Sequence, residues 1–137
     1  MKFYAVYDTN VLISSLLTQH RDSATSKVID AIASKKIVPL YNQSILDEYD
    51  EVLHRKKFNF PEEKIQKIIS MIRSFGLFVN AFPTGEILPD MDDIIFYEVV
   101  MEKRDDDAYL ITGNMKHFPK RSYIVTPAQM MEILNQS

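Results

Sequence analysis

The sequence predicts an α/β fold in which helices cover both faces of a mostly parallel, five-stranded sheet. Short apolar runs suited to buried strands alternate along the chain with segments of helical periodicity. The 137 residues are the usual size of one domain, and 46% of them are hydrophobic, as in soluble globular proteins. Cysteine, repeats and long apolar runs are absent. We therefore expect one cytoplasmic domain over residues 1–137, without disulfides or a membrane span.

The first half of the chain is expected to supply two strands and four helices. The apolar run Phe3–Tyr7 is continuous, as in a strand buried on both faces. The other elements follow from periodicity and capping signals: helices Val11–Leu17, Ser23–Ser34, Gln43–Lys56 and Pro61–Phe75, and strand Ile37–Tyr41. Pro39 indicates that the second strand lies at an edge or is interrupted, because proline has no N–H to donate.

The second half is expected to add three strands and two helices. Gly76 ends the fourth helix, and Leu77–Val79 forms the third strand. A fifth helix follows the acidic turn that begins at Pro89, and it carries an apolar stripe. The remaining elements are strand Ala108–Thr112, strand Tyr123–Val125 and a last helix whose capping box begins at Thr126.

Acidic side chains occur where this topology would bring strand ends together. Asp8 directly follows the first strand, and Glu48 borders the apolar stripe of the third helix. Asp92 and Asp93 both fall in the first turn of the fifth helix, where periodicity does not distinguish which one faces the core. Because ligands bind beyond the carboxyl ends of parallel strands, these carboxylates are candidates for a common site.

Each candidate also has an ordinary structural explanation. Asp8 suits a helix N-cap, Glu48 shares its helix with other acids, and acids in a first helical turn are favoured by the helix dipole. Asn114 follows the fourth strand and is a common turn residue. The hypothesis of a site therefore depends on the residues occurring together, not on any one of them.

A cluster of carboxylates requires a cation or raised pKa values. Two like charges about 5 Å apart repel by about 3 kcal/mol at an effective dielectric constant of about 20. Oxygen ligands, without cysteine or a paired-histidine motif, favour Mg²⁺ or Mn²⁺. Such an ion in an open pocket suits phosphodiester hydrolysis, because it activates water and stabilises the leaving oxygen.

The charge balance argues against binding nucleic acid by bulk electrostatics. The formal net charge is -3, whereas nucleic-acid-binding domains are usually basic. An RNA backbone would have to contact local basic residues, for example Arg55-Lys-Lys57, Lys116 and Lys120-Arg121. The three histidines lack a metal-ligand spacing and are expected at the surface or on the substrate side: His20, His54 and His117.

Four short motifs and a terminal Thr-Pro pair occur in a specific order along nearly the whole chain. They are Asp8-Thr-Asn, Leu46-Asp-Glu-Tyr-Asp-Glu-Val-Leu53, Asp90-Met-Asp-Asp93, Thr112-Gly-Asn-Met-Lys-His-Phe-Pro119 and Thr126-Pro127. This order resembles the PIN domain family, most closely its bacterial toxin–antitoxin subgroup. The resemblance implies a three-layer α/β/α fold, Mg²⁺ or Mn²⁺ in an acidic pocket, and cleavage of single-stranded RNA. It also implies a homodimer and an antitoxin protein as partner.

The resemblance assigns roles to individual residues. Asp8, Asp93 and Glu48 would hold the metal, and Glu48 would also orient or deprotonate the attacking water. Asp92 would be a further ligand. Four neutral side chains would hydrogen-bond to water, carboxylates or the scissile phosphate: Thr9, Asn10, Thr112 and Asn114. Asn114 stands where the family often has Asp, so it adds no charge to a second metal site.

Two other interpretations stay open from the sequence. Asn114 and the acidic balance would also suit a catalytically inactive PIN-like module that binds RNA or acts as a scaffold. Asp8 after the first strand would also suit an aspartyl phosphatase or a phospho-receiver. However, Asp8-Thr-Asn lacks the second Asp of such a phosphatase, and neither the acidic pair nor the late Lys of a receiver is evident.

Overall fold

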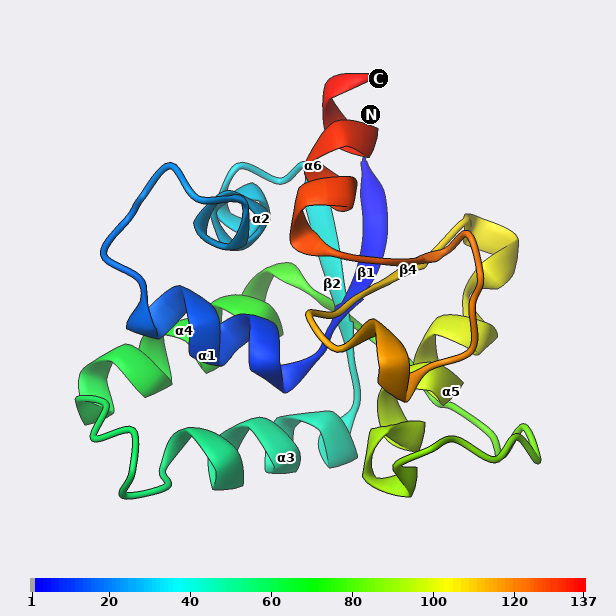
Figure 1. Cartoon of the computed structure of the whole chain (residues 1–137), viewed down its shortest axis with the longest axis horizontal. Coiled ribbons are helices and arrows are strands. Elements are labelled where there is room, and N and C mark those ends of the chain that lie inside the picture. The colour runs from blue at the N-terminus through cyan, green and yellow to red at the C-terminus, as the bar shows by residue number, and fades with distance from the viewer. Residues whose placement is uncertain (1) are drawn as a thin grey trace.

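The computed structural model describes residues 2–137 and has the α/β architecture that the sequence predicts. Five parallel strands form one sheet in the order β3-β2-β1-β4-β5 (Figure 1). The strands are β1 (Phe3–Tyr7), β2 (Ile37–Tyr41), β3 (Leu77–Phe78), β4 (Tyr109–Ile111) and β5 (Ile124–Val125). The prediction of a mostly parallel five-stranded sheet is therefore confirmed.

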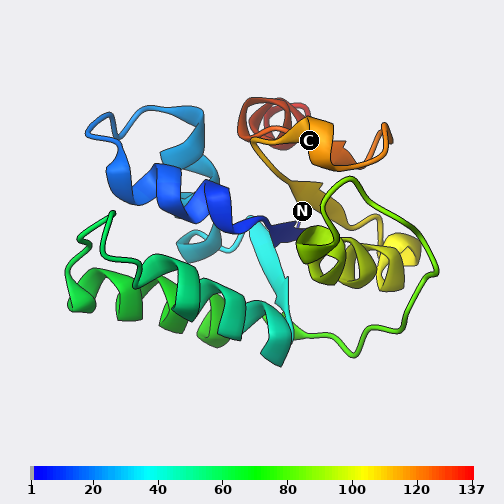
Figure 2. The same cartoon turned by 60° about the horizontal axis from the view of Figure 1, so that its bottom comes forward.

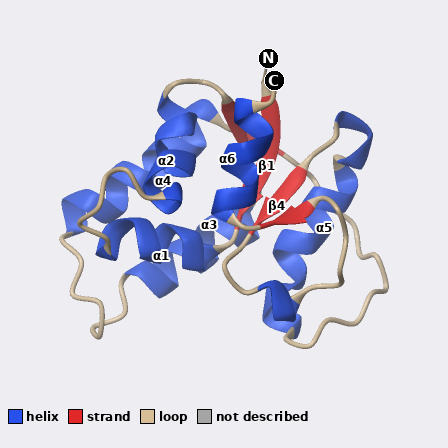
Figure 3. Cartoon of the chain, turned by 45° about the horizontal axis from the view of Figure 1, so that its top comes forward, coloured by secondary structure: helices blue, strands red, loops and turns tan. Residues whose placement is uncertain are grey.

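Six α-helices in the described part of the chain cover the sheet. They are α1 (Thr9–Leu17), α2 (Ala24–Ala33), α3 (Gln43–Leu53), α4 (Glu62–Phe75), α5 (Ile94–Glu102) and α6 (Pro127–Asn135). Helices α2 and α6 pack together, whereas α5 contacts β1, β2 and β4. Figure 3 shows α5 and α6 on opposite sides of the strands, which gives the three α/β/α layers. Within residues 2–137, no helix is both long and apolar enough to cross a membrane.

Strand β1 occupies the centre of the sheet because its side chains are apolar on both faces. Ala5, Val6 and Tyr7 are all fully buried, and β1 pairs with β2 on one side and with β4 on the other. A parallel sheet covered on both faces requires this kind of continuous apolar strand. The central position matters for function because the chain leaves β1 between β2 and β4 and passes directly into α1 (Figure 2).

The prediction that Pro39 marks an edge or an interruption is wrong. Strand β2 is continuous and lies between β1 and β3. It pairs with β3 only at Leu40 and Tyr41, so Pro39 precedes the segment that has a partner on both sides. A missing N–H is tolerated there because no strand lies on that side of β2 to accept it.

Three helix boundaries also differ from those expected. Helix α1 begins at Thr9, not at Val11. Helix α3 ends at Leu53, not at Lys56. Helix α5 begins only at Ile94, because a 3-10 turn over Met91–Asp93 precedes it. This turn sets the directions of the acidic side chains before α5, which helical periodicity alone did not distinguish.

Candidate metal centre and active site

Asp8 lies at the centre of the carboxyl edge of the sheet, directly after β1. Its backbone N–H donates to the carbonyl oxygen of Ile111 at 3.0 Å, which continues the β1–β4 ladder by one residue. Its side chain is the N-cap of α1, because Oδ1 accepts from the N–H of Asn10 at 3.5 Å. Asp8 is only 3% exposed. The capping role and a role in a site therefore coexist in one buried carboxylate.

Thr112 connects the end of β4 to Asp8. Its hydroxyl donates to Oδ2 of Asp8 at 2.7 Å and accepts from the N–H of Asn114 at 2.9 Å. Thr112 is fully buried, so these bonds are shielded from water. The hydroxyl thus fixes the orientation of the Asp8 carboxylate and the turn that carries Asn114.

Glu48 precedes a tyrosine that anchors α3 to the end of β1. The Tyr49 side chain is fully buried, and its hydroxyl donates to the carbonyl oxygen of Tyr7 at 2.5 Å. Tyr7 is the last residue of β1, so this bond ties α3 to the backbone next to Asp8. Glu48 itself is half-buried.

Asp93 is positioned through packing of the helix that follows it. The ring of Phe96 in α5 stacks on that of Tyr49, with centroids 6.2 Å apart, so the helices that carry Glu48 and Asp93 are packed together. The Asp93 side chain is 14% exposed, whereas Asp92 is an exposed residue. The structure thus distinguishes two neighbouring acids that the sequence left equivalent.

His117 is a site residue that the sequence analysis did not select. Its Nδ1 lies 3.0 Å from Oδ2 of Asp93, and its side chain is 41% exposed. Ligand-type atoms of Asp90, Asp93 and His117 all lie within 4.8 Å of one another. The sequence analysis expected His117 at the surface or on the substrate side. It did not predict the contact with Asp93, because no motif spacing relates two residues 24 positions apart.

Asp8 and Asp93 interact electrostatically across the edge. Burial raises the pKa of Asp8, while its hydrogen bonds and the charge of His117 act in the opposite direction. Burial, followed by the charge of Asp8, raises the pKa of Asp93 to about 6. The charge of Asp8 therefore disfavours ionisation of Asp93.

Glu48 belongs to the same electrostatic group. Burial is the main cause that raises its pKa, and the charges of Asp92 and Asp8 add to it after that of Glu51. Arg55 acts in the opposite direction. Asp8 thus affects the ionisation of both Glu48 and Asp93, and burial is the largest cause that disfavours the charged form of each of the three acids.

This donor set fits a hard divalent cation. Asp90 and Asp93 offer carboxylate oxygens and His117 offers an imidazole nitrogen within 4.8 Å of one another. Asp8 and Glu48, which are coupled electrostatically to each other as Asp8 is to Asp93, would add further carboxylate oxygens. Mg²⁺ and Mn²⁺ prefer oxygen ligands and accept a site completed by water. A bound cation would also stabilise the ionised carboxylates, whose pKa values are raised mainly by burial.

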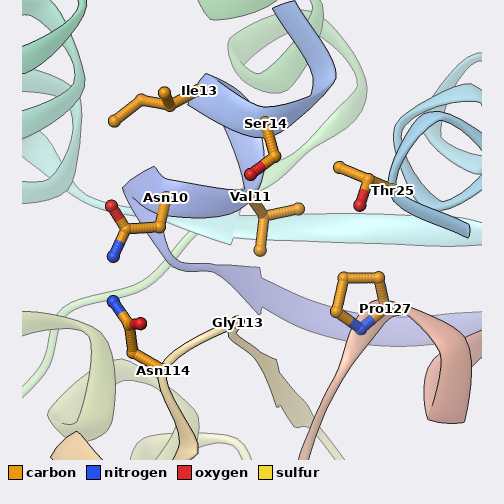
Figure 4. A pocket seen from close by; sticks show the side chains of 8 residues that line it. All are labelled: Asn10, Val11, Ile13, Ser14, Thr25, Gly113, Asn114 and Pro127. Atoms are coloured by element: carbon orange, nitrogen blue, oxygen red, sulfur yellow. The ribbon is translucent and has the colours of Figure 1, made fainter. Parts of the chain in front are cut away.

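Two of the predicted neutral residues line a cleft beside the acids, and a third is buried. Asn10 and Asn114 face this cleft, together with residues of α1, α2 and α6 (Figure 4). Thr9 is 4% exposed, and its hydroxyl oxygen has no hydrogen-bond partner among residues 2–137. The buried Thr9 hydroxyl thus differs from that of Thr112, which hydrogen-bonds to both Asp8 and Asn114.

Thr9→Val is expected to stabilise the metal-free protein by about 1 kcal/mol. A buried hydroxyl without a partner costs roughly 1–3 kcal/mol, and valine has nearly the same shape. Urea denaturation in EDTA measures the change. Thr112→Val is the matched control and is expected to destabilise, because its hydroxyl bonds both Asp8 and Asn114. A loss of stability in Thr9→Val would mean that this hydroxyl has a partner.

Comparison with known protein families identifies the family to which this chain belongs. Residues 4–116, which include all three acids, match the PIN domain family. The chain belongs to the PIN domain family. This membership indicates a nuclease-type function, and PIN domains usually bind a divalent metal through acidic residues.

Two relatives illustrate how far the similarity extends. An uncharacterised protein of Methanocaldococcus jannaschii is 32% identical over 117 residues, which cover 83% of this PIN domain chain and 72% of the relative. A protein of Thermoanaerobacter named ribosomal protein uS12 methylthiotransferase RimO is 29% identical over 116 residues, which cover 80% of this chain but only 26% of that protein. No solved structure matches the chain significantly.

Proposed function

We propose that this PIN domain is a Mg²⁺- or Mn²⁺-dependent endoribonuclease that cleaves single-stranded RNA. The observation that carries the proposal is the electrostatic coupling of Asp8 to both Asp93 and Glu48, three carboxylates from three different elements. Carboxylates brought together against their repulsion favour a cation. A cation at an open edge of the sheet suits hydrolysis of a phosphodiester.

Each acid has a distinct part in the proposed reaction. Asp8 and Asp93 would hold the metal, and the metal when bound would activate water and stabilise negative charge on the phosphate. Glu48 is half-buried with a raised pKa, which suits a group that accepts the proton of the attacking water. The water oxygen bonds to phosphorus, the phosphorus–oxygen bond to the departing ribose breaks, and that oxygen takes up a proton.

His117 would act as a positioning residue for Asp93. Its Nδ1 contacts Oδ2 of Asp93, which leaves Oδ1 of that carboxylate free for the metal. Outer-shell partners of this kind orient metal ligands and typically contribute 10–100-fold to affinity or activity. Asp92 is exposed and would contribute to the metal through a bound water.

A basic cleft next to the site suits the RNA backbone. Lys116, Lys120 and Arg121 line a hollow of about 500 Å³ on the segment that connects β4 to β5. This segment also carries Asn114 and His117, so its cations lie close in the chain to the acidic edge. Local cations can bind phosphates although the chain as a whole is acidic.

Glu48→Gln tests the proposal most directly. Labelled single-stranded RNA is incubated with the wild type in Mn²⁺, in Mg²⁺ and in EDTA, and with each variant in Mn²⁺. We expect metal-dependent cleavage that Glu48→Gln lowers at least about 100-fold, since general-base catalysis contributes about 10²–10⁴-fold. Asp47→Asn is the matched control, because Asp47 lies exposed on the same helix. Equal cleavage by wild type and Glu48→Gln would contradict the proposed role.

Mn²⁺ binding is expected to weaken as the pH falls through about 6. Metal ligands bind in the deprotonated form, and the pKa of Asp93 is raised to about 6 by burial and by the charge of Asp8. The same raised pKa means that Asp93 stabilises the metal-free protein at low pH, and this stabilisation is lost as the pH rises through about 6. Calorimetric titration with Mn²⁺ between pH 5 and 8 measures the trend. Affinity that does not change over this interval would contradict the assignment of Asp93.

The biological setting is a further part of the proposal. Through its resemblance to the bacterial toxin–antitoxin subgroup, we propose that the chain is a cytoplasmic toxin, that it forms a homodimer and that an antitoxin protein inhibits it. Expression of the wild type, but not of Glu48→Gln, should then arrest growth. Growth unaffected by an RNA-cleaving wild type would favour a housekeeping nuclease, and absence of both metal binding and cleavage would favour an inactive RNA-binding module.

A further inference from the structure

A second hollow lies directly beside the acidic edge, between the starts of three helices. It has a volume of about 360 Å³. Its walls come from α1, from the beginnings of α2 and α6, and from the turn after β4. Its lining residues include Asn10, Val11, Ser14, Thr25, Asn114 and Pro127. This volume is at the lower end of the range of small-molecule sites, about 300–1,000 Å³.

The cleft is polar but carries no charged side chain. Figure 4 shows the amides of Asn10 and Asn114 directed toward one another at one end, with Thr25 and Pro127 at the other end. Within residues 2–137, neither amide side chain has a hydrogen-bond partner. A phosphate group would find no cation here, whereas an uncharged ligand with several donors and acceptors would find partners for all of them.

The backbone of both asparagines is fixed to the acidic site. The N–H of Asn10 donates to Oδ1 of Asp8, and the N–H of Asn114 donates to the hydroxyl of Thr112, which itself donates to Oδ2 of Asp8. A ligand held between the two amides therefore lies next to Asp8. The cleft and the metal site share one structural frame.

We infer that this cleft is a subsite for one unpaired ribonucleoside of the substrate, adjacent to the scissile phosphate. The inference rests on the proposed ribonuclease function and deepens it. The amides of Asn10 and Asn114 hydrogen-bond to the edge of the base, as asparagine does with exposed base edges. The hydroxyls of Ser14 and Thr25 suit the ribose hydroxyls, and Pro127 offers an apolar surface to the ring.

The protein would then contact the RNA in two ways. The uncharged cleft, which Asn114 lines, takes a nucleoside, and the basic hollow at Lys116, Lys120 and Arg121, which follow Asn114 in the chain, takes phosphates. A paired nucleotide would have its base edge engaged by its complement. The cleft therefore selects single-stranded over double-stranded RNA, a selectivity that the metal site alone does not provide.

The test uses nucleosides without metal, so that it does not depend on catalysis. The ¹⁵N-labelled full chain in EDTA is titrated by NMR with cytidine, with adenosine and with inorganic phosphate. We expect saturable shifts of the Asn10, Ser14 and Asn114 amides with the nucleosides and none with phosphate. Ser14→Trp and Thr25→Trp block the cleft from two walls and should abolish these shifts. Leu17→Trp, at an exposed position of α1 outside the cleft, should retain them.

Cleavage kinetics supply the second readout. Ser14→Trp should raise KM for single-stranded RNA at least tenfold while its Mn²⁺ affinity equals that of the wild type. Nucleosides that cause no saturable shift at the cleft, or equal shifts in the wild type and in both blocking variants, would overturn the subsite. Nucleoside binding without any RNA cleavage would instead overturn the ribonuclease function on which the inference rests.

Discussion

Asp8→Asn is expected to abolish RNA cleavage and, at neutral pH, to raise the stability of the metal-free protein. Loss of activity follows because Asp8 is the carboxylate that couples to both Asp93 and Glu48. Outer-shell partners of metals already contribute 10–100-fold, so removing a direct ligand should lower activity more than about 100-fold. Asparagine keeps the shape: its one oxygen can cap α1 as well as that of aspartate does, and its NH₂ group can donate to the Thr112 hydroxyl in place of accepting from it.

The gain in stability follows from the direction of the pKa shift. Burial raises the pKa of Asp8 in the folded state, so its stabilising contribution is complete below its unfolded pKa and is lost as the pH rises through the folded pKa. At pH 7 the ionised carboxylate disfavours the fold, and a neutral amide removes that penalty. A gain of roughly 1 kcal/mol would raise Tm by about 2–4 °C in a chain near this size.

Thermal unfolding at pH 7 in EDTA and in Mn²⁺ separates the two effects. The wild type should gain stability from Mn²⁺, and Asp8→Asn should not, although it starts from a higher Tm. Asp30→Asn on the exposed face of α2 is the control for loss of an unrelated carboxylate. A lower Tm for Asp8→Asn in EDTA would show that the Asp8 charge is compensated in the fold, contrary to the pKa shift.

Gly76→Ala is expected to be the most destabilising single-methyl change in the fold. A Cβ at Gly76 would lie 2.5 Å from the carbonyl oxygen of Pro39 and closer still to that of Ile72. Both are backbone atoms, one in β2 and the other in the last turn of α4, so neither can move without shifting an element. Overpacking of this kind costs typically 1–3 kcal/mol, and we expect about 3 kcal/mol here.

Urea denaturation compares this variant with Gly113→Ala. A Cβ at Gly113 would meet no atom within 4 Å, so that change should have little effect on stability. Glycine is required at position 76 by lack of space for a side chain and not by backbone conformation, because its φ of -92° with an extended ψ is open to any residue. Equal free energies of unfolding for the two variants would mean that β2 and α4 can separate easily at this contact.

The sequence by itself determined the elements and the residues that follow them. The apolar run Phe3–Tyr7 is β1 with the expected bounds, and the capping box at Thr126 begins α6. Local signals suffice for these features because periodicity and caps act within a few residues. The acid after β1 was also a candidate from the sequence, since a central parallel strand places its carboxyl end at the usual ligand edge.

The tertiary structure decided what depends on contacts between distant segments. It separated Asp93 from Asp92 through the 3-10 turn before α5, and it brought His117 to Asp93. It also placed β2 inside the sheet, with Pro39 just before the residues that pair with β3, and gave Gly76 its role through close approach of two backbones. Side-chain direction and interatomic distance arise from packing of whole elements, and no local pattern of residues encodes them.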